Sequence, residues 1–233
     1  MRLNYLLLDV FTKERLKGNP LAVVLKADAL LDDQMQLIAG EFNLSETVFI
    51  CKPRQERHTA CVRIFTPQVE LPFAGHPTVG AAVVLGLQGR STAVRIEEEV
   101  GLITCVIEQA EKRSAFARFA LPQLPKPAGE APDAGQLAGA LGLSVDEIGC
   151  GPYAPAVYSA GVAFYLVPVR DAAALRKVKP ERRGWAEIFP IGHNSVYVFT
   201  ETPGEAGNRF AARMFAPGMG LGETRQPAPR RPH

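Results

Sequence analysis

The sequence has few of the residues on which disulfide scaffolds and metal sites depend. Its four cysteines are scattered, and no two form a C-x-x-C pair: Cys51, Cys61, Cys105 and Cys150. His58, His76 and His193 lie far apart, and none has the i, i+4 partner that helical metal motifs use. This pattern predicts reduced thiols, no disulfide framework and no bound metal.

Long apolar runs and clustered charge are also missing. No run approaches the roughly 18 apolar residues of a membrane span, and Met1-Arg2-Leu3 leads directly into a strand-like segment rather than a signal peptide. We therefore expect a cytoplasmic protein with no membrane partner. The net charge is +2, and the basic residues form no stripe with interleaved aromatic residues, which argues against nucleic-acid binding. The 233 residues, 47% of them hydrophobic, suit one large globular domain or two small ones.

The most informative segment present is 63–87, which contains Gly-His-Pro at 75–77. Proline suits the first turn of a helix, so we expect a helix over 77–87 with the free amides of residues 78–80 at its open N-terminus. The helix dipole makes such an end attractive to anions. Residues 79–87 carry no charged side chain, which predicts that other structure encloses this helix.

A short internal repeat, called the echo below, indicates that the chain has two related halves. The segment Arg213–Gly218, R-M-F-A-P-G, resembles Arg63–Pro67, R-I-F-T-P. The proline-rich segment 122–127 is the clearest linker between them, so we expect a first lobe over 1–121 and a second over 122–223. Strand-like runs outnumber helical patterns, which favours an α+β fold of largely antiparallel sheets, each enclosing a helix, over a parallel nucleotide-binding sheet.

The second copy of the repeated segment, Arg213–Gly218, is not followed by a second helix pattern. Residues 224–233 contain three prolines, which remove backbone donors and clash with a helical turn. We therefore expect the second lobe to lack its central helix and the tail to be disordered.

Two titratable residues occupy positions that suit proton transfer. Glu46 lies between a helical pattern and a hydrophobic strand, where burial would raise its pKa into the range of a general acid/base, although the pattern alone favours an exposed loop glutamate. His76 is either a neutral donor at a helix N-terminus or a turn residue bonded to a carbonyl. Gly75 either admits a ligand close to the backbone or supplies a positive φ. For His76 and Gly75 the pattern leaves both readings open.

Four motifs in order across the chain carry a family resemblance. They are D-V-F-T…G-N-P-L-A-V-V at 9–24, N-L-S-E-T-V-F at 43–49, F-A-G-H-P-T-V-G at 73–80 and R-M-F-A-P-G at 213–218. In order and spacing they resemble the phenazine-biosynthesis PhzF-like family. The resemblance implies a fold similar to diaminopimelate epimerase, in which two pseudo-symmetric lobes each roll a sheet round a central helix and the active site lies between them.

The resemblance also implies an isomerase that needs no cofactor. Its substrate would be a small cyclic or amino-acid-like carboxylic acid, as in dihydro-hydroxyanthranilate isomerisation. Glu46 matches the family's acid/base and His76 a histidine close to it, whereas the epimerase relatives use two thiols. The candidate substrate-binding residues are Asn19, Pro20, Ser45, Gly75, Pro77 and Thr78. A homodimer is also expected.

The chain departs from the family pattern after Gly222-Glu223. There the family continues D-P-A-T-G-S-A-A, and this sequence continues T-R-Q-P-A-P-R-R-P-H. Inserting one G after the Glu223 codon lets codons permitted for the tail read D-P-A-T-G-S-A-A. Our hypothesis is a frameshifted, C-terminally truncated family member, which is either an active isomerase or an inactive remnant that only binds a ligand or partner.

Overall fold

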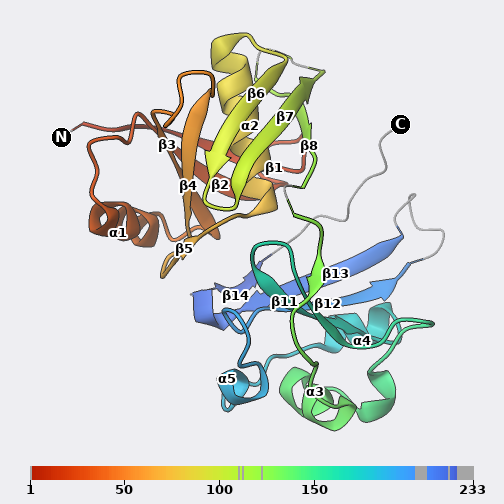
Figure 1. Ribbon diagram of the computed structural model, residues 1–233. Coiled ribbons are helices and arrows are strands. Elements are labelled where there is room, and N and C mark those ends of the chain that lie inside the picture. The colour runs from red at the N-terminus through yellow and green to blue at the C-terminus, as the bar shows by residue number, and fades with distance from the viewer. Residues whose placement is uncertain are drawn as a thin grey trace. The chain divides into compact units, whose positions relative to one another are not determined.

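The computed structural model forms two compact units, Met1–Leu124 (unit 1) and Pro125–His233 (unit 2). It describes residues 2–109, 111, 113–121, 123–202, 209–219 and 221–224, the last four by their backbone only. Each unit combines a curved sheet with a few helices, as Figure 1 shows. The expected α+β class is confirmed.

Unit 1 is built on an eight-stranded sheet. Its elements are β1 (Asn4–Val10), β2 (Asn19–Leu25), α1 (Asp32–Phe42), β3 (Glu46–Cys51), β4 (Ala60–Phe65), β5 (Glu70–Leu71), α2 (Gly75–Gly89), β6 (Ala93–Glu98), β7 (Gly101–Glu108) and β8 (Phe116–Phe119). The strand order is β1-β2-β3-β4-β6-β7-β8, and β5 pairs with β4. The β2–β3 and β4–β6 pairs are parallel, and the other pairs are antiparallel.

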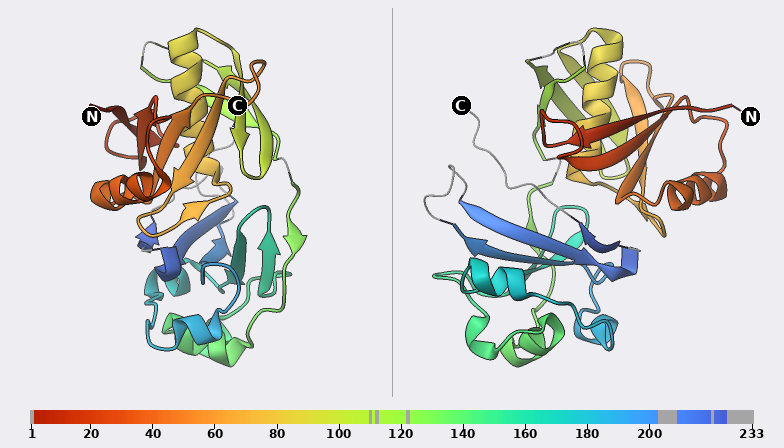
Figure 2. Two further views of the ribbon diagram at one scale, coloured as in Figure 1. Left: turned by 60° about the vertical axis from the view of Figure 1, so that its left-hand side comes forward. Right: turned by 180° about the vertical axis from the view of Figure 1, so that it is seen from behind.

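The sheet of unit 1 curls round α2, which packs against β1, β2, β3, β4, β6, β7 and β8 (Figure 2). Its small residues allow this close packing. At Gly80 a Cβ would meet the Leu21 side chain at 2.3 Å, and at Gly86 it would meet the Ile107 side chain at 2.6 Å. The helix covers the predicted range 77–87 and extends two residues further at each end.

Helix α1 packs on the outer face of β3 and β4. Its Met35 and Ala39 join Phe49 and Phe65 in a buried cluster. Successive residues of a strand point to opposite faces, so β3 and β4 use one set of side chains against α1 and the alternate set against α2. The sheet is therefore buried on both faces where the two helices cover it.

Unit 2 repeats the combination with a six-stranded sheet. Its elements are β9 (Lys126–Pro127), α3 (Ala134–Leu141), the 3-10 helix η1 (Val145–Glu147), β10 (Ala156–Ser159), β11 (Ala163–Pro168), α4 (Ala172–Lys177), α5 (Trp185–Ile188), β12 (Val196–Glu201), β13 (Phe210–Ala216), the 3-10 helix η2 (Pro217–Met219) and β14 (Leu221–Thr224). The strand order is β14-β13-β12-β11-β10-β9. Only the β11–β12 pair is parallel among these described strands.

Helices α3, α4 and α5 lie on one face of this sheet (Figures 1 and 2). They enclose a core in which Leu137, Tyr165, Trp185, Phe189 and Phe215 are almost fully buried. The Trp185 indole donates to the carbonyl of Asn194, so its polar atom is satisfied inside the core. Unit 2 therefore has an apolar core of its own.

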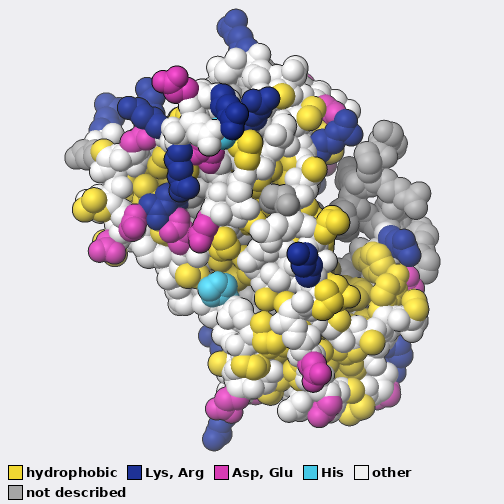
Figure 3. Space-filling model, in the orientation of Figure 1, with side chains coloured by type: hydrophobic (Ala, Val, Ile, Leu, Met, Phe, Trp, Pro, Cys, Tyr) yellow, Lys and Arg dark blue, Asp and Glu magenta, His cyan; other side chains and the backbone are white. Residues whose placement is uncertain are grey.

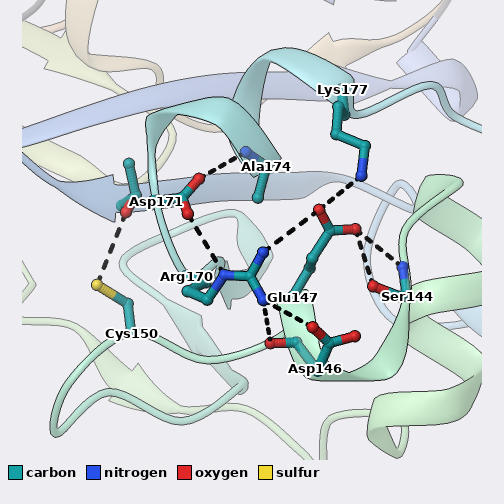
Figure 4. Close-up of polar contacts among 9 residues, drawn as sticks. Ser144, Asp146, Glu147, Cys150, Arg170, Asp171, Ala174 and Lys177 are labelled. Carbon is teal, nitrogen blue, oxygen red and sulfur yellow. Dashed lines mark hydrogen bonds and ion pairs between the residues drawn. The ribbon is translucent and has the colours of Figure 1, made fainter.

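A polar cluster holds η1 to α4, as Figure 4 shows. The buried Glu147 carboxylate accepts hydrogen bonds from the Lys177 ammonium at 2.7 Å and from the backbone and hydroxyl of Ser144 at 3.0 Å each. The hydrogen bond from Lys177 is the main reason why the pKa of Glu147 lies below its usual range. Arg170 bonds the neighbouring Asp146 at 2.6 Å. The contacts of Lys177 and Arg170 join residues 30 and 24 apart in the chain, which gives the cluster a structural role.

The other face of the unit 2 sheet carries apolar side chains that stay half-exposed, among them Phe164, Leu166 and Phe199. Hydrophobic side chains are also prominent on the surface of unit 2 in Figure 3. Within the described part of unit 2, no helix is enclosed by the sheet as α2 is in unit 1. Thr224, the first residue of the expected disordered tail, closes β14, and residues 225–233 lie outside the described residues.

Candidate active site

Glu46 is the first residue of β3, directly after the turn that ends α1. Its side chain is buried, with 5% of the residue exposed, so it is not the exposed loop glutamate that the pattern alone favoured. Burial raises the pKa of its carboxyl to about 8, because a charged group loses hydration in the interior. At neutral pH the group is mostly protonated and has the affinity for protons that a general acid/base needs.

His76 faces Glu46 from the first turn of α2. The Nε2 atom of His76 lies 3.2 Å from Oε2 of Glu46, and both side chains are more than nine-tenths buried. Neither atom makes a hydrogen bond of good geometry to any described residue. Burial lowers the pKa of the imidazole to about 3, so His76 is neutral at physiological pH. Two buried polar atoms without bonded partners point toward each other, an arrangement that suits a polar ligand between or beside them.

Helix α2 starts earlier than the sequence predicts, and its N-terminal end is called the mouth of the helix below. Ala74 is the N-cap, and the amide of Thr78 bonds to the Ala74 carbonyl at 3.1 Å. The expected free amides at residues 78–80 are therefore wrong, because these residues lie past the first turn of a helix that begins at Gly75, and Pro77 has no amide hydrogen. The free amides of the first turn belong to Gly75 and His76. They are two donors at the positive end of the helix dipole, where an anion is stabilised.

Gly75 is exposed, and open space surrounds the position where a Cβ would stand. Its φ does not lie in the left-handed region, so the turn does not require glycine for its conformation. Of the two readings of Gly75, the one based on positive φ is wrong. The other reading, that Gly75 lets a ligand approach the backbone, stays a prediction.

The candidates on β2 lie at the same end of the sheet as Glu46. The parallel register pairs Leu21 with Glu46, which places Asn19 and Pro20 beside the turn that contains Ser45. Asn19 is buried, Pro20 is exposed and Ser45 is half-buried. Their assignment to substrate binding stays a prediction.

Sequence reasoning missed two further residues, one beside His76 and one bonded to the first turns of α2. The ring of Phe11 lies 6.3 Å from that of His76, and Phe11 has a φ of 64°, an uncommon conformation for a non-glycine residue. Glu98, at the end of β6, reaches Thr78 in α2 with an Oε1–Oγ1 distance of 2.7 Å. Glu98 follows Glu97 and precedes Glu99, and such a run gives no signal that its middle member is buried.

No group of three or more metal-binding side chains gathers within the described ranges, and none of the helices there is long and apolar enough to cross a bilayer. What the geometry offers is a buried carboxyl, a neutral imidazole and two free amides at one helix mouth. Together they form a candidate proton-transfer site that can also hold an anionic substrate.

The fold and this site agree with a known protein family. A family model described as phenazine biosynthesis-like protein matches residues 8–225. The chain therefore belongs to the phenazine biosynthesis-like (PhzF) family.

Relatives and solved structures support this membership. The chain is 43% identical over 222 residues to an uncharacterised isomerase of Mesorhizobium japonicum, covering 92% of this chain and 73% of that protein. It is 34% identical over 220 residues to the trans-2,3-dihydro-3-hydroxyanthranilate isomerase of Pseudomonas fluorescens, covering 94% and 74%. The Bacillus anthracis phenazine biosynthesis protein of the PhzF family is similar in structure, with a TM-score of 0.81, 25% identity and coverage of 98% and 77%.

A more distant likeness concerns the fold alone. The hydroxyproline epimerase of Agrobacterium vitis matches with a TM-score of 0.60 and 14% identity, covering 96% of this chain and 72% of that one. The expected epimerase-like fold is confirmed. The chain spans about three quarters of the length of these proteins, and the frameshift hypothesis stays a prediction.

Proposed function

We propose that this chain is a cofactor-independent isomerase that moves a proton on a small cyclic or amino-acid-like carboxylic acid. The observation that carries the proposal is the buried Glu46–His76 pair, 3.2 Å apart, at the mouth of an enclosed helix. A relative at 34% identity is named a trans-2,3-dihydro-3-hydroxyanthranilate isomerase, so an acid of that kind is the first substrate to test.

In the proposed reaction the ionised Glu46 carboxylate takes a proton from one substrate carbon and returns it to another. The product has the same atoms and electrons as the substrate, so no cofactor takes part in the balance. Negative charge develops on the substrate while the proton is on Glu46. The neutral imidazole of His76 and the free amides of the helix mouth are placed to stabilise that charge.

The raised pKa of Glu46 gives the reaction a pH dependence. Only the ionised carboxylate can begin as a base, and burial keeps most of the population protonated at neutral pH. The rate should therefore rise as the pH increases toward the pKa of Glu46 and level off above it.

The test is isotope exchange in D₂O with trans-2,3-dihydro-3-hydroxyanthranilate, followed by mass spectrometry and NMR. We expect deuterium to enter the substrate carbon skeleton, and Glu46→Gln to slow this entry by about 10² to 10⁴, the usual contribution of a general acid/base. Glu99→Gln is the matched control, because Glu99 is an exposed glutamate of the same unit. Unchanged exchange in Glu46→Gln, with exchange present in the unaltered chain, would remove Glu46 from the mechanism.

The alternative is a catalytically inactive chain that only binds a ligand or partner. It is favoured by the half-exposed apolar face of the unit 2 sheet, which includes Leu166 and Phe199. The same exchange experiment, run beside a version with the reading frame restored after Glu223, separates the two. Exchange by the restored protein alone supports the inactive reading, and exchange by both supports the isomerase.

A further inference from the structure

The hydroxyl of Thr78 lies between two oxygen atoms. Its Oγ1 is 2.8 Å from the carbonyl oxygen of Ala74 and 2.7 Å from Oε1 of Glu98. A hydroxyl has one proton to donate, and a backbone carbonyl has none. Both contacts are hydrogen bonds only if Glu98 carries a proton and donates it to Thr78.

The surroundings of Glu98 also disfavour its ionised form. The residue is 5% exposed, and its Oε2 atom has no partner among the described residues. Thr78 faces it from α2 and Cys105 from β7. Burial, and after it the charge of Glu98, raises the pKa of the Cys105 thiol. On its own strand, Glu97 is engaged by His58 at 2.6 Å. No cation among the described residues is bonded to it, and burial raises the pKa of Glu98 to about 7.

We propose that Glu98 is a positioning residue of the α2 mouth, held in its protonated form against Thr78. The protonated Glu98 donates a hydrogen bond to the Thr78 hydroxyl, which in turn donates a hydrogen bond to the carbonyl of Ala74. The N-cap is thereby fixed in the position that presents the free amides of Gly75 and His76. The role is indirect, because Glu98 acts through Thr78 and the helix.

Loss of this proton should weaken the mouth in two ways. The Ala74 contact loses its hydrogen bond when Thr78 donates to the carboxylate instead. A negative charge also appears beside the positive end of α2, where it competes with an anionic ligand. The proposal rests on the proposed function, because it concerns the same site. Its test does not require catalytic turnover.

The experiment is an NMR titration of the full chain in the Glu46→Gln background, which removes the other titrating carboxyl of the site. The carboxyl carbon of Glu98 is followed with ¹³C-labelled glutamate and assigned by its loss in Glu98→Gln. The backbone ¹⁵N shifts of Gly75 and His76 are followed in parallel. We expect Glu98 to titrate well above the usual glutamate range near 4.3 and both amides to shift with the same midpoint.

Two further variants decide between a positioning role and a merely structural one. Glu98→Gln keeps a donor for Thr78 and cannot ionise, so the amides should keep their low-pH shifts at every pH. Glu98→Ala removes the donor, so the amides should lose those shifts throughout. A Glu98 carbon that titrates in the ordinary range, or an amide transition that survives Glu98→Gln, would overturn the proposal.

The outcome is independent of whether the chain is an isomerase. An absence of deuterium exchange with a confirmed Glu98 titration would refute the proposed function and leave the positioning role. Deuterium exchange with an ordinary Glu98 titration would do the reverse.

Discussion

Replacing Glu46 by glutamine should change the pH dependence of the stability of unit 1. The carboxyl has a pKa of about 8 in the folded chain and 4.5 as its reference value. Between these values the folded state binds more protons than the unfolded state, so the contribution of Glu46 destabilises the fold increasingly as the pH rises. Glutamine has nearly the same shape and does not titrate, so this contribution vanishes in the variant.

The magnitude follows from the two pKa values. One unit of pKa difference corresponds to about 1.4 kcal/mol, so the destabilisation by Glu46 grows from about 1 kcal/mol at pH 5 to about 3 kcal/mol at pH 7. Relative to the unaltered chain, Glu46→Gln should therefore gain about 2 kcal/mol between these two pH values. The imidazole of His76, whose pKa is lowered, destabilises the fold as the pH falls below its reference value of 6.5. To a first approximation that contribution is common to both proteins and cancels.

The assay must report on unit 1. The single tryptophan, Trp185, lies in unit 2, so tryptophan fluorescence would follow the other unit. Native-state hydrogen exchange of the α2 amides measures the opening free energy of unit 1 directly. Glu99→Gln serves as the control and should stay within about 0.5 kcal/mol of the parent at both pH values. A Glu46→Gln difference that does not change between pH 5 and pH 7 would refute the burial-based account of its pKa.

Three other predictions concern packing, the second unit and the coding sequence. Gly86→Ala should be less stable than the control Gly89→Ala by about 1–3 kcal/mol in urea unfolding, because a Cβ at Gly86 meets Ile107 and one at Gly89 meets open space; equal stabilities would contradict the close packing of α2. In hydrogen exchange, residues 156–215 should be less protected than 3–118, and equal protection in a monomer would show that the unit 2 sheet needs no further cover. Sequencing the coding DNA at Glu223 should show a lost nucleotide, and an intact frame with no family-like alternative would end the frameshift hypothesis.

Local sequence signals predict the elements of this fold better than their ends. The uncharged run after Pro77 predicts an enclosed helix, and α2 is enclosed. Proline favours the first turn but does not fix its position within it, so the sequence places the helix start at Pro77 and the structure places it at Gly75. This shift of two residues decides which amides are free at the mouth.

Burial of single carboxyls is the part that sequence could not predict. Glu97, Glu98 and Glu99 are chemically alike neighbours, yet only Glu99 is exposed. Glu97 is satisfied by backbone amides of the loop after β3 and by His58, whereas Glu98 has only one bonded oxygen, which contacts Thr78. These partners lie 20 or more residues away in the chain. The same holds for Glu46. The motif identifies its position in the sequence, but its burial depends on the packing of β3 against α2.

The two sheets repeat one strand plan. Strands β10–β13 pair in the order antiparallel, parallel, antiparallel, as β1–β4 do. The motif Arg63–Phe65 lies in β4, and its echo Arg213–Phe215 lies in β13. Phe65 pairs with Thr47 in unit 1, and Phe215 pairs with Val196 in unit 2. The echo in the sequence therefore corresponds to equivalent positions in the structure.

This equivalence indicates which unit carries the proposed chemistry. The residue before Thr47 is Glu46, and the residue before Val196 is Ser195, so the acid/base candidate of unit 1 corresponds to a serine in unit 2. Both residues are buried. A serine hydroxyl is not ionised near neutral pH and cannot act there as a base in the way a carboxylate does, so Ser195 cannot take over the role proposed for Glu46. The shared strand plan accounts for the fold of both units, whereas the proposed proton transfer depends on a carboxyl that only unit 1 supplies at this position.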